Sequence, residues 1–215
     1  LHCARNPFGR DAWFNIGRLA VDATDALALG RAEIEGRRQA WRAARYIKAN
    51  VPGCAAGDLA AFGTQIGVRE TRRVRGDHVL TAEELLKPER FADTIALGAY
   101  PIDIHPTTGG GLTYQPMGED HAYHIPYRSL VPTAFDNALS AGRGVSATHT
   151  ALAAIRVMSI SMAVGQAAGT AAALACGATN RRPNRHNDRC VDVRSVPLAA
   201  LRTRLERDGA ILDAG

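Results

Sequence analysis

The sequence predicts a soluble α/β fold in which helices pack against short strands. Three observations support this: an amphipathic pattern from Arg31 to Asn50, strand-like runs between Gln65 and Val131, and an uncharged alanine-rich run from Val157 to Ala175. Of the 215 residues, 46% are hydrophobic and 22% are charged. A chain of this length and composition buries one good core or two small ones.

The N-terminal part predicts one strand and one long helix. The apolar residues between Phe14 and Val21 favour a strand, and Ile34, Trp41 and Ile47 fall on one side of a helix over residues 31–50. Pro52 and Gly53 then end the helix. We expect this helix to be solvated on one side and packed on the other.

The segment from Gln65 to Leu80 alternates as a pair of strands does, with a turn at Gly76–Asp77. Charges at Arg69, Glu70, Arg72 and Arg73 would lie on both faces of such a strand. A solvent-exposed sheet edge explains these charges, and so does a site that binds a carboxylate.

Further elements follow along the chain. Thr81 and Glu84 form a capping box that predicts a short helix up to Leu86. We expect strands over Ala92–His105 and Tyr123–Val131, with a loop over Thr107–Gly118 between them.

The stretch from Ala141 to Ala175 organises the rest of the chain. We expect a short strand over Asn137–Ala141, then Gly142-Arg143-Gly144, where the backbone can approach a ligand closely. A buried helix is predicted from Arg156 to about Ala175 because alanine favours helix. Gly165 and Gly169 give that helix a thin face that another backbone can approach.

The charge pattern around Arg156 is unusual. No Asp or Glu occurs from Asn137 to Asn187, whereas Arg143 and Arg156 remain. The N-terminus of a helix is the unfavourable end for a cation. Either an anionic or electron-rich ligand lies between Arg156 and the free helix N–H groups, or a carboxylate from elsewhere pairs with it.

Three other interpretations of this stretch are weaker. Gly142 to Ala147 fits G-x-G-x-x-A, but no helix opens directly after it and no acid follows at the required distance. The uncharged run is long enough for a membrane span but is poor in Leu, Ile and Phe. Ser146 and His149 lack a nearby acid and a nucleophile elbow. We therefore expect no membrane partner.

Histidines and cysteines do not predict a metal site. His121 and His124 are expected at the surface, while His105 and His149 end strand-like runs, where sites are often built. The four cysteines are widely spaced, with no C-x-x-C pair, which indicates reduced thiols of a cytoplasmic protein. The net charge of +5 is spread along the chain without aromatic interleaving, so nucleic acid is not an expected partner.

Several segments resemble a known protein family in their amino-acid sequence. Ala-Gly-Arg at 141–143, Ser-Ala-Thr-His at 146–149, Ile-Arg-Val-Met at 155–158 and Gly-Gln-Ala-Ala-Gly-Thr-Ala-Ala-Ala at 165–173 resemble the C-terminal flavin segment of the bacterial FAD-dependent oxidoreductases often labelled putative xanthan lyase. Residues 31–54, 65–85, 98–105 and 124–132 extend the likeness, which covers about Ala4 to Leu212. That family is related to the glutathione-reductase-like FAD fold.

The resemblance implies a partial FAD-binding fold of the α/β class. Residues 1–132 would supply substrate-domain and sheet-returning elements, residues 133–180 the last FAD-binding strand and helix, and residues 181–215 a loop and a closing helix. The N-terminal Rossmann unit of the family, with its G-x-G-x-x-G turn, is missing from this sequence. We therefore expect this unit as a partner, in the same or another chain, and little tight FAD binding by the chain alone.

The resemblance also implies a flavin site and a reaction. FAD would be the cofactor, and hydride transfer between FAD and an unknown small substrate would be the reaction. His149 and Arg69 are the candidate catalytic residues. The alternative function is a non-catalytic fragment or interaction module that needs a partner chain to complete its sheet. The residues implied to contact the cofactor are Gly142, Arg143, Arg156, Val157 and Met158.

Overall fold

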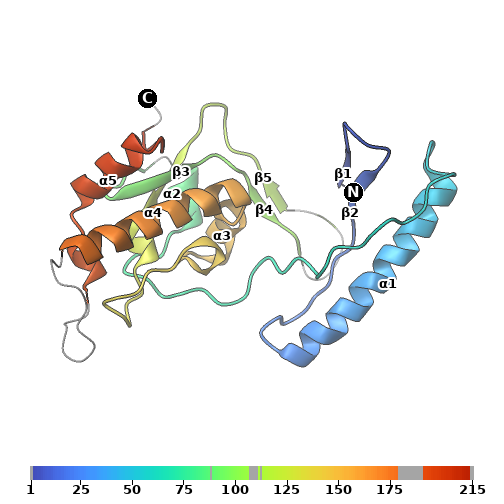
Figure 1. Cartoon of the computed structure of the whole chain (residues 1–215), viewed down its shortest axis with the longest axis horizontal. Coiled ribbons are helices and arrows are strands. Elements are labelled where there is room, and N and C mark those ends of the chain that lie inside the picture. Colours follow the sequence, from blue (N-terminus) through green and yellow to red (C-terminus); the bar gives the residue numbers. More distant parts are fainter. Residues whose placement is uncertain (1, 88, 107–110, 112, 179–190, 214–215) are drawn as a thin grey trace. The chain divides into compact units, whose positions relative to one another are not determined.

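The computed structural model describes residues 2–87, 89–106, 111, 113–178 and 191–213. Of these residues, those up to Thr71 form one compact unit and those from Arg72 onward form a second. Figure 1 labels the helices and strands of both units.

The first unit contains a hairpin and one long helix. Strands β1 (His2–Arg5) and β2 (Ala12–Asn15) pair antiparallel. Helix α1 (Ala26–Asn50) begins five residues before the predicted start, because the Asp25 side chain caps it by accepting from Leu27 N at 2.8 Å. The predicted end of the helix is confirmed, but its predicted packed side is not, since Ile34 is 56% exposed and Trp41 is 52% exposed. The Trp41 and Phe62 rings meet edge to face at 5.6 Å and pack the following loop onto α1.

The predicted strand pair over Gln65–Leu80 is wrong. This segment has no strand, only isolated bridges from Gly76 to Pro132 and from Leu80 to Ala147. Charges on both faces of residues 69–73 leave neither face able to pack against a core. Single long-range bonds satisfy the backbone instead, such as Val74 N to Gly144 O at 2.9 Å.

The second unit contains two antiparallel strand pairs. Strand β3 (Thr94–Gly98) pairs with β6 (Tyr123–Pro126), and β4 (Ile102–Ile104) pairs with β5 (Thr113–Gln115). Helix α2 (Ala82–Leu86) carries the predicted capping box between Thr81 and Glu84.

Two predicted strands are wrong in extent. The single strand expected over Ala92–His105 is broken at Pro101, whose ring fixes φ and which has no N–H to pair. The strand expected over Tyr123–Val131 ends at Pro126 and continues as the 3₁₀ turn η1 (Tyr127–Leu130).

The predicted strand over Asn137–Ala141 is also wrong. Ser140 N makes one bond to Leu130 O, at 2.8 Å, and no ladder follows it. The chain then forms the 3₁₀ turn η2 (Gly142–Gly144) and the helix α3 (His149–Ile155), which the sequence had not predicted. Thr148 caps α3 by accepting from Ala151 N at 3.3 Å.

Helix α4 (Met158–Ala178) starts two residues after the predicted position. Its buried residues form one stripe that packs on β3 and on α5 (Leu198–Arg207). The other face is open: Met158 is 84% exposed, Met162 is 74% exposed, and no described atom lies within 4 Å of a Cβ added at Gly165 or Gly169. The buried stripe consists of Ile160, Val164, Ala167, Ala171 and Ala175.

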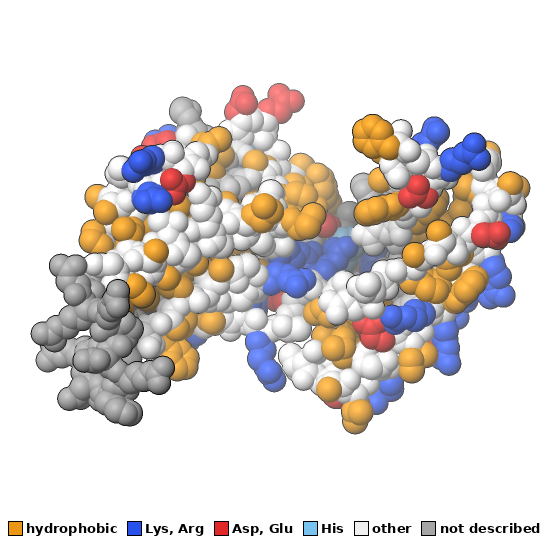
Figure 2. All heavy atoms as spheres, in the orientation of Figure 1, with side chains coloured by type: hydrophobic (Ala, Val, Ile, Leu, Met, Phe, Trp, Pro, Cys, Tyr) orange, Lys and Arg blue, Asp and Glu red, His pale blue; other side chains and the backbone are white. Residues whose placement is uncertain are grey.

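By length and composition, α4 is the one helix in the described part of the chain that is apolar enough to cross a membrane. In Figure 2 the surface over α4 is mostly white and orange. The apolar side chains of α4 therefore lie partly in the packed stripe and partly on the uncovered face.

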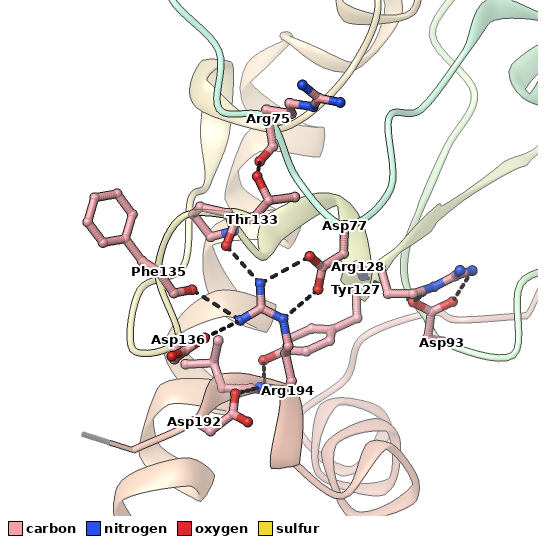
Figure 3. A network of polar contacts seen from close by, with 12 residues as sticks. Arg75, Asp77, Asp93, Tyr127, Arg128, Thr133, Phe135, Asp136, Asp192 and Arg194 are labelled. Atoms are coloured by element: carbon pink, nitrogen blue, oxygen red, sulfur yellow. Dashed lines mark hydrogen bonds and ion pairs between the residues drawn. The ribbon is translucent and has the colours of Figure 1, made fainter. Parts of the chain in front are cut away.

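A polar network holds the segment that leads to η2. Arg194, in the 3₁₀ turn η3 (Val193–Ser195), donates to both carboxylate oxygens of Asp77 and to Asp136 Oδ1 (Figure 3). Tyr127 Oη donates to Val193 O at 2.8 Å. Burial, followed by the nearby Asp192 carboxylate, raises the pKa of Tyr127 to about 12. The network joins three segments that are far apart in the sequence.

The expectation that His124 lies at the surface is wrong. His124 is 5% exposed on β6, and its Nδ1 lies 3.3 Å from Thr94 Oγ1. Burial lowers the pKa of His124, and the nearby Arg90 charge lowers it further. His121 is half-buried.

Candidate functional site

The η2 turn presents an open glycine backbone beside an arginine-rich segment. Gly142 has φ +61°, and no described atom lies within 4 Å of a Cβ added there. Arg143 is exposed. The bond from Val74 N to Gly144 O brings the segment containing Arg73 and Arg75 next to this turn. The turn packs against α4, so a positive region borders the helix.

Arg156 lies between α3 and α4 and is tied to strand β4. Its backbone N–H caps α3 by donating to Leu152 O at 3.0 Å. Its Nη2 donates to the main-chain oxygen of Asp103 at 2.6 Å. The predicted alternatives were an anionic ligand and a partner carboxylate, whereas this contact is to a peptide carbonyl. The carbonyl fixes the guanidinium at the start of α4.

The first turn of α4 opens onto a hollow. Its N–H groups have no acceptor within the helix, as at every helix start. Val157 is half-buried and Met158 is exposed. Ser159 and Ile160 line a hollow of about 420 Å³ together with residues 97–101. A ligand in this hollow would meet N–H donors and the positive end of the helix dipole.

Asp103 and His105 form an acid–imidazole pair on the hairpin that contains β4 and β5. His105 Nε2 lies 3.0 Å from Asp103 Oδ1 and 3.1 Å from Oδ2. Both side chains are mostly buried, at 15% and 25% exposed. A carboxylate that orients an imidazole in this way is a common arrangement for proton transfer. The sequence had marked the position of His105 but not its partner.

A larger hollow of about 760 Å³ adjoins the first. Both hollows share Ala99 and Pro101, and the larger one is also lined by Tyr114, Asp120 and His121. Asp103 is the register partner of Tyr114, and side chains of such partners point to the same face of a strand pair. The acid–imidazole pair is therefore on the face that carries Tyr114.

The structure places the predicted site residues in two groups. Arg69 is exposed and belongs to the first unit, in a stretch without regular structure. The other six belong to the second unit. Gly142 and Arg143 lie in η2, while Arg156, Val157 and Met158 form the junction of α3 and α4. His149 is the exposed first residue of α3.

Comparison with known families decides the class of the protein. The family model described as FAD dependent oxidoreductase matches residues 6–204. The chain belongs to this family. FAD is thus the cofactor of the oxidoreductase. No curated protein and no solved structure matches the chain.

The donor groups of this FAD dependent oxidoreductase suit a flavin dinucleotide. FAD has an anionic pyrophosphate and a ring whose N1 and O2 edge gains negative charge on reduction. Arg143, Arg156 and the first N–H groups of α4 supply donors, and Gly142 leaves space for close backbone approach. In the described part of the chain, no group of three or more His, Cys, Asp or Glu side chains is placed to share a metal ion.

Proposed function

We propose that this chain is the C-terminal part of a flavin-dependent oxidoreductase that transfers hydride between FAD and a small substrate. The supporting observation is the start of α4, where Arg156 is held against β4 beside a hollow lined by Ser159. The family match over residues 6–204 supplies the cofactor.

In this proposal each residue has a defined task. Gly142 lets the backbone approach the cofactor and Arg143 neutralises its phosphates. Arg156 and the N–H groups of Val157 and Met158 stabilise negative charge on the ring edge. FAD supplies the hydride chemistry itself. His149 and Arg69 remain candidates for proton transfer and substrate binding, and the Asp103–His105 pair joins them because of its geometry.

The fold part of the proposal is a partial glutathione-reductase-like domain. A Rossmann unit, in the same or another chain, would bind the pyrophosphate and cover the open face of α4. The exposed Met158 and Met162 support the need for such a covering. We place the oxidoreductase in the bacterial cytoplasm, without nucleic acid or membrane as partners.

FAD titration tests this proposal. The purified chain alone should stay colourless after gel filtration, whereas the same chain joined to or co-expressed with the Rossmann unit should retain stoichiometric yellow flavin. Tight flavin binding by the chain alone would overturn the requirement for a Rossmann unit. Absence of flavin even with the Rossmann unit would favour the alternative, a non-catalytic module that completes its sheet with a partner.

A further inference from the structure

We propose that the hollow of about 760 Å³ beside the β4–β5 hairpin binds an organic ammonium ion, and that the oxidoreductase acts on substrates of this class. The identity of the substrate rests on the proposed function. The binding of the ion rests only on the residues of the hollow, so the two parts can fail separately.

The walls of the hollow combine apolar and polar surface in about equal parts. Pro101, Pro116 and Met117 line it together with the aromatic ring of Tyr114. Asp120 is its one Asp or Glu, and none of its described lining residues is Lys or Arg. Small-molecule sites combine apolar walls with a few polar groups that select the ligand. Here the selecting charge is negative.

The sequence around the hollow is acidic, whereas the chain as a whole is basic. From Phe91 to Tyr127 there is no Lys or Arg, although the chain as a whole has a net charge of +5. Asp93 pairs with Arg128, and Asp103 pairs with His105. Glu119 and Asp120 remain in the loop between β5 and β6, whose tip carries acidic side chains in Figure 2.

The hydrogen-bonding groups of the hollow favour a donor ligand. His121 Nε2 lies 2.6 Å from Leu85 O, and a carbonyl only accepts, so Nε2 carries the proton. In the neutral ring Nδ1 is therefore an acceptor. The Asp120 carboxylate also accepts, and the face of the Tyr114 ring attracts cations. An ammonium group donates to the first two and is attracted by the third.

Asp120 occupies a backbone conformation that disfavours most residues. The turn from Gly118 to His121 closes through His121 N to Gly118 O at 3.2 Å, and Asp120 has φ +60°. Asp and Asn tolerate this region better than other non-glycine residues. Replacement by Asn therefore removes the charge and keeps the turn, so Asp120→Asn tests the effect of the charge alone.

The hollow adjoins the proposed flavin-binding end of α4 through Ala99 and Pro101. For a substrate R₂CH–NH₃⁺, one proton leaves the ammonium group for His121 Nδ1 or water. The C–H hydride, with both electrons, would then pass to bound FAD, which would be the oxidant. The resulting R₂C=NH₂⁺ takes up water and gives R₂C=O and NH₄⁺, so atoms and charge balance.

Binding of benzylammonium, benzyl alcohol and benzoate to the full chain, followed by NMR at low salt without FAD, tests the proposal. Benzylammonium should shift the amides of residues 114–122, and the other two probes should bind at least about tenfold more weakly. Asp120→Asn should weaken benzylammonium binding by about tenfold or more. The matched control is Glu119→Gln, which removes a neighbouring charge outside the hollow and should change the affinity less than about twofold.

Three results would overturn the proposal: no amide shift with benzylammonium, equal binding of benzyl alcohol, or an equal loss in Glu119→Gln. Since no flavin is present, none of these results depends on whether the chain binds FAD. If benzylammonium binds as expected but the holoenzyme fails to oxidise it and other primary amines, the binding site stands and the substrate class is wrong.

Discussion

Arg194 donates to both carboxylate oxygens of Asp77, through Nε at 2.8 Å and Nη2 at 3.0 Å. The two residues are 117 positions apart in the sequence. Nη2 also donates to Pro132 O at 2.9 Å, so one guanidinium joins the segments before α2, before η2 and before α5 (Figure 3). The Asp77 hydrogen bond raises the pKa of Arg194, which stays charged.

Replacement of Arg194 by Met should lower the melting temperature of the chain, because several carbonyl and carboxylate acceptors lose their donor together. Arg204→Met is the matched control, since within the described part of the chain the Arg204 side chain pairs only with Asp208, on the exposed side of α5. Thermal unfolding followed by circular dichroism compares the two. Equal melting temperatures for both variants would show that the network does not hold the segments.

Buried His124 should make the fold sensitive to mild acid. Its pKa in the folded state is lowered, so below about pH 6.5 the unfolded chain takes up a proton that the folded chain does not. The free energy of unfolding should therefore fall as pH decreases, by at most about 1.4 kcal/mol per pH unit from this group. Urea unfolding between pH 5 and 7.5 should give a shallower decrease for His124→Gln. The same slope in both proteins would remove His124 as the cause.

The two faces of α4 should respond differently to added volume. Ala167 is fully buried, whereas Ala172 is exposed on the same helix. Ala167→Leu should lower the free energy of unfolding by about 1–3 kcal/mol, because it overpacks the core. Ala172→Leu should change the free energy by less than about 0.5 kcal/mol. Urea denaturation of both variants measures the difference, and similar values would mean that the buried stripe is misplaced.

A carbonate wash of the membrane fraction from cells tests whether α4 crosses a membrane. The large apolar residues that lipid rewards are few in α4, so the protein should leave the membrane fraction on washing. Retention after the wash would make α4 a membrane helix. Poor solubility without a partner would not, because the open face of α4 invites association.

Elements specified by a local sequence pattern could be predicted from the sequence. The capping box of Thr81 and Glu84, the amphipathic α1 and the alanine-rich α4 were all predictable, because propensity and capping act over a few residues. Helix α3 also has a local signal in its Thr148 cap, but its short length and the adjacent α4 concealed it.

Strand predictions failed where long-range bonds replace a ladder. Residues 65–80 alternate in sequence and residues 137–141 were expected to form a short strand, yet their backbone groups bond singly to distant segments, as Leu80 N does to Ser146 O at 3.1 Å. Side-chain contacts were likewise predictable only between residues that are close in the sequence. Asp103 and His105 share a strand face by spacing alone, but the contact of Arg156 with Asp103 spans 53 residues and needs the fold.

In the proposed function, Arg156 at the start of α4 faces the flavin. In the holoenzyme with its Rossmann unit, Arg156→Met should lower the midpoint potential of FAD by about 30–60 mV, the equivalent of one charge-assisted hydrogen bond to the reduced ring. The control is Arg202→Met, since Arg202 Nη1 likewise donates to a strand carbonyl, that of Thr94, at 3.0 Å. Both variants lose one such bond and should lose similar thermal stability.

Spectroelectrochemical titration of the wild type and these two variants is the most direct measurement. We expect a lower potential for Arg156→Met and an unchanged potential for Arg202→Met. An unchanged potential in Arg156→Met would contradict this expectation, and the role of Arg156 would then be limited to the hydrogen bond that connects the start of α4 to β4.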